Sequence, residues 1–166
     1  MQSQFKVNIT VKDMYTFLMN NTYRKFTGII WIIFSLIVIG VTIYTWGDIK
    51  IANSILLIVL ASLYTVVHPI ILWLKANAQI KNNNYFSQTL DYSVDSKGIK
   101  VSQGEESTII KWDEMWKAVK YGSIVVVYVS TIRAFILPVR CIGDQYNNLV
   151  DVAMQGLGSK CHLRKK

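Results

Sequence analysis

The hydrophobic pattern of the chain is dominated by two long stretches without charge, Phe26–Gly47 and Ile51–Leu74. A helix needs roughly 20 apolar residues to cross the hydrocarbon core of a bilayer, and both stretches are long enough. We therefore predict two membrane-spanning helices, over residues 27–46 and 51–74. Only Asp48, Ile49 and Lys50 separate the stretches, so the two helices must form a hairpin with both ends on one side of the bilayer.

The N-terminal segment, residues 1–25, has the pattern of a strand followed by an amphipathic helix. Apolar and polar side chains alternate over Phe5–Val11, which predicts a half-buried strand. Asp13 then suits a helix N-cap, and the helix is expected to run toward Arg24. Because a single strand is not stable in water, we expect the N-terminal strand to join a sheet built by residues beyond the hairpin.

Residues 85–158 have the pattern of a small β domain closed by a helix. Turn residues separate six short runs of strand-forming residues, and Gly98 suits a positive φ at the end of the first turn. From the predicted cap Asp144, apolar residues recur with helical spacing up to Leu157. The six predicted strands are Phe86–Val94, Ile99–Gln103, Ser107–Trp112, Met115–Tyr121, Ile124–Ser130 and Ala134–Val139.

These elements together predict a membrane α-helical hairpin plus a small antiparallel β barrel or sandwich. Seven strands, with the N-terminal strand included, and a C-terminal helix closing one end match a pleckstrin-homology-like plan. Residues 75–84 are the expected juxtamembrane linker, and residues 159–166 are an expected basic, frayed tail.

The net charge of +8 is concentrated outside the β domain, because residues 84–158 hold seven Lys and Arg against eight Asp and Glu. This distribution argues against nucleic-acid binding and favours attraction to an anionic lipid bilayer. Basic residues flank the hairpin, whereas its loop offers only Lys50 beside Asp48. The positive-inside rule then predicts a multi-pass plasma-membrane protein with cytoplasmic N- and C-termini. The residues expected to contact the membrane surface are Arg24, Lys25, Lys75 and Lys81.

His68 is the sharpest candidate for a functional side chain, because ionisable groups at membrane depth are costly and often functional. The alternative is structural: His68 shares a helical face with Ala61 and Thr65 that could meet Ser35 and Thr42 of the first helix. We favour a polar contact within the hairpin. The sequence contains no Gly-rich phosphate loop, nucleophile elbow or metal-binding pair, so we expect no catalytic, cofactor-binding or metal-binding residues.

Several motifs of the C-terminal part resemble the bacterial YcxB-like family. They are the hairpin Leu90–Val101, the segment Ile110–Glu114 with its Trp-Asp pair, and the strand Ala134–Pro138. The resemblance implies the same layout: a short N-terminal strand and helix, two transmembrane helices and a small β domain, similar to bacterial pleckstrin-homology-like membrane proteins. It implies no catalytic residue.

The expected function is therefore that of a non-enzymatic, membrane-anchored scaffold or regulatory interaction module on the cytoplasmic face. Its partners would be the lipid bilayer and a membrane or cytoplasmic protein, with a homo-oligomer as a further option. The alternative is immunity to an antimicrobial peptide, such as a bacteriocin, or protection against membrane stress. A transporter subunit or an enzyme ranks lower, because a two-helix hairpin encloses no pore by itself.

Overall fold

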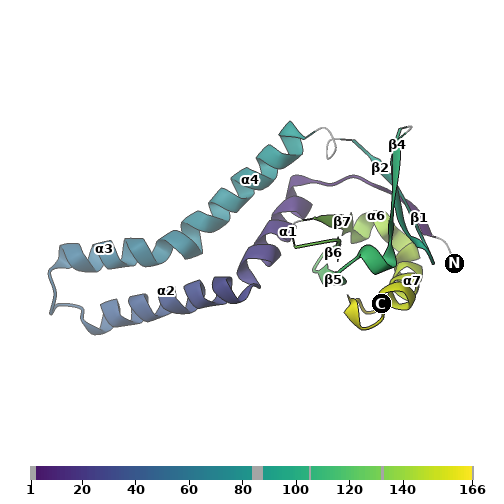
Figure 1. The fold of residues 1–166 in the computed structure, drawn as a ribbon. Helices are drawn as coiled ribbons and strands as arrows, with labels where there is room; N and C mark the ends of the chain where they lie inside the picture. The colour runs from purple at the N-terminus through teal and green to yellow at the C-terminus, as the bar shows by residue number, and fades with distance from the viewer. Residues whose placement is uncertain (1–2, 84–87, 105, 132, 166) are drawn as a thin grey trace. The chain divides into compact units, whose positions relative to one another are not determined.

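The computed structural model describes residues 3–83, 88–104, 106–131 and 133–165 (Figure 1). The chain forms two compact units. Met1–Phe17 and Ala78–Lys166 form the β domain, and Leu18–Asn77 form the hairpin unit. The boundaries between the units fall inside helices α1 (Val11–Tyr23) and α4 (His68–Asn82). The expected linker, residues 75–84, is therefore helical over 75–82, and residue 84 lies outside the described residues.

Helix α1 begins three residues earlier than predicted, because its N-cap is Thr10 and not Asp13. The Asp13 backbone N–H donates to Thr10 Oγ1 (3.4 Å), and Asp13 Oδ2 accepts from the Thr10 backbone N–H (2.8 Å). This reciprocal pair is a capping box, in which the acidic residue stands at the third helical position. The preceding strand, β1 (Ser3–Val7), is correspondingly shorter at its C-terminal end than the predicted Phe5–Val11.

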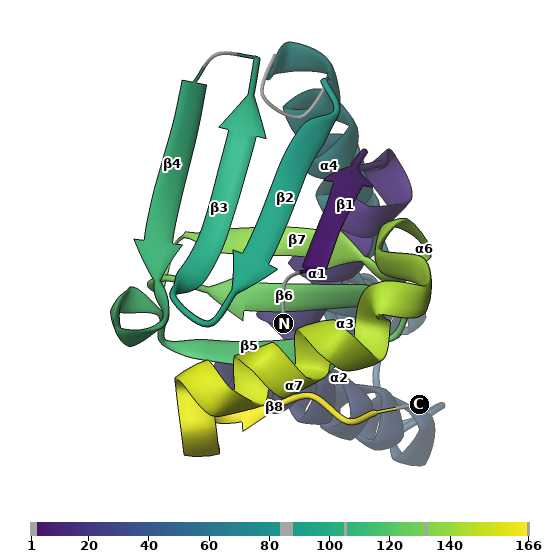
Figure 2. The same cartoon turned by 90° about the vertical axis from the view of Figure 1, so that its right-hand side faces the viewer.

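The first sheet of the β domain has the strand order β1-β2-β3-β4, and all its neighbours are antiparallel (Figure 2). Strand β1 pairs with β2 from Ser3 opposite Val94 to Val7 opposite Leu90, which confirms that the N-terminal strand joins the sheet. The remaining strands are β2 (Leu90–Asp95), β3 (Gly98–Gln103) and β4 (Glu106–Lys111). The predicted start of β2 at residues 86–87 lies outside the described residues.

Gly98 is required for a different reason than predicted. Its φ is not positive, unlike that of Gly104 or Gly122 at the other hairpin turns. A Cβ atom at residue 98 would instead collide with the carbonyl oxygen of Ile110 on β4. Glycine therefore allows β3 and β4 to approach closely at this point.

The second sheet has the order β7-β6-β5-β8, and its strands run across those of the first sheet (Figure 2). Strand β8 pairs in parallel with β5, with Cys161 opposite Ala118. The expectation of a frayed tail is therefore wrong for this part, where Leu163 is also buried. A two-residue strand has no alternation that a sequence could reveal. The strands are β5 (Lys117–Tyr121), β6 (Ile124–Tyr128), β7 (Ala134–Pro138) and β8 (Cys161–His162).

Helix α7 (Tyr146–Leu157) packs against β2 and β5 and buries six of its residues. Gly156 lies directly on the indole ring of Trp112, where a Cβ would not fit. Asp144 does not cap α7, because it lies in the 3₁₀ turn that precedes the helix. The short helical elements are η2 (Trp112–Glu114), α6 (Val139–Ile142), η3 (Gly143–Gln145) and η4 (Gly158–Lys160).

The coarse fold prediction, antiparallel sheets combined with helices, is confirmed. No strand ladder joins the two sheets in the described part of the chain, so a closed barrel is not confirmed.

The hairpin unit contains helix α2 (Phe26–Tyr44) and a second helix that begins with α3 (Ile51–Ser62). The second helix continues through the π-helical segment η1 (Leu63–Val67) into α4, as Figure 1 shows. Both helices are long and apolar enough to cross a membrane, as predicted. Only 17% and 11% of their most apolar windows are buried, so most of their apolar side chains are not packed against the rest of the chain.

The buried residues of α2 and α3 are small. In α2 they are Gly28, which lies against the backbone at the end of α1, Ser35 and Thr42, spaced by seven. In α3 they are Ser54 and Ala61, with the same spacing. A stripe of small side chains lets two helix backbones approach closely, which is typical of helix pairs in membranes.

Candidate functional site

The irregular turn around His68 is the most distinctive feature of the hairpin unit. The backbone N–H of His68 bonds to the carbonyl of Leu63, one residue further back than in an α-helix. The carbonyl of Tyr64 would accept from residue 68 in an α-helix and from residue 69 in a π-helix. The N–H of His68 is already bonded to Leu63, and Pro69 has no N–H, so neither residue donates to this carbonyl. The hydroxyl of Tyr23 donates to this carbonyl at 2.8 Å. A side chain from the end of α1 thus completes a backbone interrupted by proline.

Aromatic rings gather around this turn. The His68 ring stacks on Tyr64 (centroids 5.1 Å apart, planes 11° apart) and meets the edge of Tyr23 at 6.0 Å. Trp31 of α2 lies 5.9 Å from Tyr64. A cavity of about 360 Å³ adjoins these rings and is also lined by Ser35. Ring packing thus holds His68 in place. Ser35, one of its two predicted polar partners, lines the same cavity.

The other predicted partner of His68 bonds within its own helix. The hydroxyl of Thr42 donates to the carbonyl of Val38 at 2.8 Å. Ser and Thr in membrane helices commonly satisfy their hydroxyls in this way.

The basic residues predicted to contact the membrane surface are all exposed. Arg24 and Lys25 precede α2, and Lys25 is its N-cap residue. Because the two helices of the hairpin run antiparallel, Lys75 returns to the same end of the unit. Lys81 lies in the last turn of α4, in the β domain.

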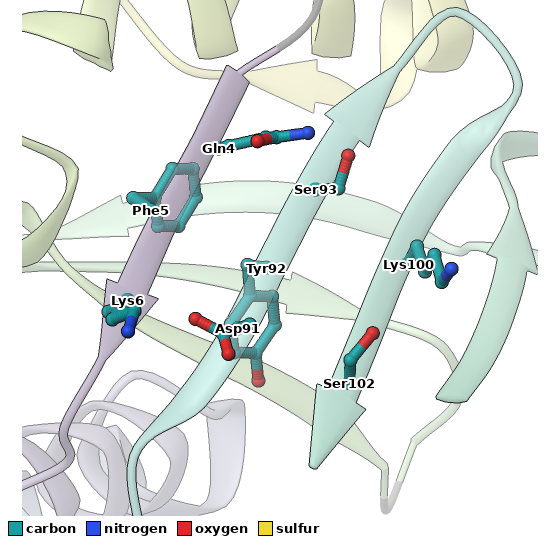
Figure 3. Close-up of a pocket in the computed structure, with 8 residues that line it drawn as sticks. All are labelled: Gln4, Phe5, Lys6, Asp91, Tyr92, Ser93, Lys100 and Ser102. Atoms are coloured by element: carbon teal, nitrogen blue, oxygen red, sulfur yellow. The ribbon is translucent and has the colours of Figure 1, made fainter. Parts of the chain in front are cut away.

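The outer face of the first sheet of the β domain carries a shallow polar hollow of about 420 Å³ (Figure 3). Lys6 lies directly opposite Asp91, and Ser93 lies opposite Lys100. On the other face of the same strands, Phe5 and Tyr92 stack at 6.1 Å with almost parallel rings. The hollow combines two ammonium groups, one carboxylate, the hydroxyls of Ser93 and Ser102, and the side-chain amide of Gln4. This mixture suits hydrogen bonding to another macromolecule.

An ion pair between Asp13 and Arg140 fixes the start of α1 to α6 within the β domain. Arg140 donates two hydrogen bonds of 2.7 Å to the Asp13 carboxylate and one of 2.9 Å to the carbonyl of Asn8. Burial alone would raise the pKa of Asp13, but the hydrogen bonds from Arg140 and Thr10 outweigh it and lower the pKa below 3.8. The hydrogen bond to Asp13 in turn raises the pKa of Arg140. The pair is structural, because each charged group is the hydrogen-bonding partner of the other.

A cavity of about 370 Å³ opens between the two sheets of the β domain. Its lining includes Tyr92 and Phe135, whose rings meet edge to face at 6.0 Å, and the exposed Arg133.

Burial raises the pKa of the Cys161 thiol in β8, which disfavours its reactive thiolate form. The described residues contain no cluster of three or more potential metal ligands.

The sequence indicated His68 but not the residues that surround it. The signal for the π-helical turn was the His68-Pro69 pair, because a proline inside a long apolar helix must leave a carbonyl without its donor. Nothing in the sequence pattern pointed to Tyr23 as the group that satisfies it.

The chain thus combines an apolar two-helix hairpin with a small β domain that includes both ends of the chain. A family model described as YcxB-like protein matches residues 94–151, from the end of β2 into α7. The matching family is the one that the sequence motifs resemble.

The protein "Uncharacterized protein YcxB" of Bacillus subtilis (strain 168) is similar to this chain, with 27% identity over 86 residues. These residues make up 52% of this chain and 46% of that relative, so the similarity spans less than half of the relative. No solved structure matches the chain.

Proposed function

We propose that this protein is a membrane-anchored, non-enzymatic interaction module, with the hairpin in the bilayer and the β domain serving as a scaffold or regulator. One observation carries the membrane part. Among the described residues, all but three of the exposed large apolar side chains lie between Phe26 and Leu74. The three others are Ile109, Trp116 and Met154. Apolar patches of such extent mark membrane or protein contact.

The distribution of small residues in the hairpin favours lipid over a protein partner as the surrounding medium. In water, large apolar side chains would turn toward the partner helix and polar ones outward. In the hairpin the order is reversed, since Ser35 and Thr42 are buried while Leu36 and Ile43 are more than 60% exposed. Lipid tails solvate the large apolar side chains as well as another helix would.

The basic residues support an orientation with both chain ends in the cytoplasm of a bacterial cell. Arg24, Lys25 and Lys75 lie at the open end of the hairpin, and the loop at the other end carries Lys50 beside Asp48. The positive-inside rule assigns the end with more Lys and Arg to the cytoplasm. The β domain would then act at the inner face of the plasma membrane.

Labelling of single cysteines in intact cells tests this topology. Cys141 and Cys161 are first replaced by Ser, and one cysteine is introduced by Asp48→Cys in the hairpin loop or Ser123→Cys in the β5–β6 turn. A membrane-impermeant maleimide should label the Asp48→Cys variant in intact cells and the Ser123→Cys variant only after lysis. The reverse result would overturn the orientation. Release of the chain from membranes by alkaline carbonate would overturn membrane insertion itself.

The scaffold role is supported by the polar hollow of Figure 3 and by the effect of anchoring. A tethered domain encounters membrane partners at a high effective concentration, so a shallow contact surface is sufficient for recognition. A pleckstrin-homology-like arrangement of the two sheets is part of this proposal. Such folds carry many functions, so the role must be read from the surface and not from the fold.

A photo-crosslinking residue in the hollow tests the scaffold role. Placed at Ser102, it should give adducts with a defined membrane or cytoplasmic protein, whereas the same residue at Ser123, on the exposed turn, should not. If neither position gives adducts, the scaffold role is wrong. If deletion of the gene also raises sensitivity to an antimicrobial peptide, the immunity role replaces it.

A further inference from the structure

The two edge strands of the first sheet differ in whether another group covers their outward backbone groups. At the β1 edge, the side chain of Gln145 takes the place of a neighbouring strand. Its Oε1 accepts from the Gln4 backbone N–H and its Nε2 donates to the Gln4 carbonyl, both at 2.8 Å. At the β4 edge, no strand pairs with β4 on the side away from β3 in the described part of the chain.

The register shows which backbone groups of β4 point away from the sheet. The β3–β4 hairpin closes with Gln103 opposite Glu106, and the pair that closes a two-residue loop is hydrogen-bonded. Bonding then alternates along the strand, so Ser107, Ile109 and Lys111 direct their N–H and C=O groups outward. Applied across β3 and β2, the same alternation directs the backbone groups of Gln4 outward, where Gln145 binds them.

Strand β4 also exposes its side chains, unlike any other strand of this sheet. Five of its six residues are exposed, and the side chain of Ile109 is 61% exposed. An open edge with an exposed apolar side chain is a template for pairing with another strand.

We propose that β4 pairs antiparallel with β4 of a second copy of this chain, with Ile109 on the two-fold axis. A two-fold axis pairs one residue with itself, and in a hydrogen-bonded pair that residue directs its backbone groups outward. Ser107, Ile109 and Lys111 meet this condition. With Thr108 or Ile110 on the axis, as a non-hydrogen-bonded pair, the exposed Ile109 side chains would not face each other. The two four-stranded sheets would thereby become one sheet of eight strands across the dimer.

Charge and overlap select Ile109 among these three. With Lys111 on the axis, two ammonium groups would stand directly opposite, which is destabilising. With Ser107 on the axis, Lys111 would lie beyond the strand of its partner. With Ile109 on the axis, Ser107 of each chain stands opposite Lys111 of the other, no like charges are paired, and the exposed isoleucines cover each other.

The contact is small, and the proposed membrane anchoring makes it sufficient. One pair of six-residue strands buries far less than the about 1,200–2,000 Å² of a stable protein interface. Confinement of both copies to one bilayer raises their effective concentration and compensates for a weak contact. The dimer therefore rests on the proposed function and should dissociate when the chain is diluted in detergent.

Cysteine crosslinking in membranes tests both the pairing and its register. In the full chain with Cys141 and Cys161 replaced by Ser, Ile109→Cys should form dimers with a short bifunctional methanethiosulfonate reagent, because paired Cα atoms are about 5.5 Å apart. Lys111→Cys alone should not, since its copies would be about 14 Å apart. Co-expressed Ser107→Cys and Lys111→Cys chains should crosslink to each other. Adding Ile109→Lys to both should lower that yield about fivefold, because like charges then meet on the axis.

Each other result overturns the proposal. Equal crosslinking of all positions would indicate random collision, and strong crosslinking of Lys111→Cys alone would contradict the register. Crosslinking of Ile109→Cys to a different protein would show that the edge accepts a foreign strand. If Ile109→Cys stays monomeric while carbonate leaves the chain in the membrane, self-pairing fails and anchoring stands. If carbonate releases the chain, the proposed anchoring fails instead.

Discussion

Strand β6 of the β domain buries all five of its residues, whereas helix α2 of the hairpin buries three of nineteen. The buried residues of β6 are Ile, Val and Tyr, and those of α2 are Gly, Ser and Thr. At the end of β6, the ring of Tyr128 lies 6.3 Å from the ring of Phe17 on α1. In α2, most of the large side chains are exposed, and the three buried residues are small.

The contrast shows that two different physical rules select the buried residues. In the β domain, burial follows apolar area, because removing it from water stabilises the fold by about 25 cal/mol per Å². In the hairpin, the buried residues of α2 are small. In the proposed membrane setting this is expected, because close backbone approach stabilises a helix pair, whereas lipid solvates large apolar side chains as well as another helix would. Removing apolar area from a side chain should therefore destabilise the β domain more than the hairpin, and enlarging a small buried residue should destabilise the hairpin.

Truncating a core leucine should give the largest effect. Leu90 on β2 is 1% exposed, and Leu90→Ala should lower the free energy of unfolding of the β domain by about 3 kcal/mol, through lost burial and the cavity left behind. Leu36 on α2 is 63% exposed, and Leu36→Ala should change stability by less than about 0.5 kcal/mol in detergent. Thermal unfolding of the full chain, followed by near-ultraviolet circular dichroism, measures both. Equal losses would contradict the distinction between the units.

A methyl group added to α2 tests whether small side-chain size or apolar area stabilises the hairpin. At Gly28, a Cβ would lie 2.8 Å from the Cα of Tyr23, whereas at Gly40 it would meet nothing within 4 Å. Gly28→Ala should therefore cost about 1–3 kcal/mol of hairpin stability through overpacking, although it adds apolar area. Gly40→Ala in the same helix should be neutral or slightly stabilising. The readout is resistance of the hairpin to unfolding by a denaturing detergent, and a neutral Gly28→Ala would contradict the close approach of Gly28 to the end of α1.

The β domain should also respond to acid through Asp13. Its pKa is lower when folded than in the unfolded chain, so its contribution to stability is present above pH 3.8 and is lost as the pH falls below that value. Asp13→Asn should cost about 1–2 kcal/mol at neutral pH, a moderate value because Arg140 is half exposed. The measurement is the unfolding free energy from pH 6 to pH 2.5. The difference between the wild type and Asp13→Asn should shrink at the acid end, and a constant difference would exclude the ion pair as its cause.

Much of the β domain was predictable because turn residues separate runs of strand-forming residues. The six strands follow from these runs, the final helix from its helical spacing, and the need of β1 for a sheet from its alternation. Three details depended on tertiary contacts. The cap at Thr10 required the position of Asp13 one turn later, Gly98 required the approach of Ile110, and β8 was too short to show a period.

The candidate sites were less predictable than the fold. The apolar runs indicated the hairpin, and the basic residues at its ends followed from composition. The open edge of β4 was not foreseen, because an edge is a property of strand order and not of any strand by itself. The same holds for the polar hollow, because its residues come from the hairpin of β2 and β3 and from β1, which is distant in sequence.

The smallest expected effect concerns the one hydrogen bond in the hairpin that proline makes necessary. Tyr23→Phe removes the hydroxyl that donates to the Tyr64 carbonyl and leaves this carbonyl without a donor. The cost should be about 1 kcal/mol of hairpin stability, the usual value for a buried hydrogen bond. The same detergent unfolding assay as for Gly28→Ala measures it.

Pro69→Ala supplies the control, because it restores a backbone N–H and permits a regular helix through the turn. In that background the Tyr64 carbonyl regains a partner in its own helix, so Tyr23→Phe should cost much less than in the wild type. The two substitutions form a double-mutant cycle whose coupling measures the dependence of one on the other. If Tyr23→Phe costs the same in both backgrounds, the hydroxyl stabilises the hairpin independently of Pro69.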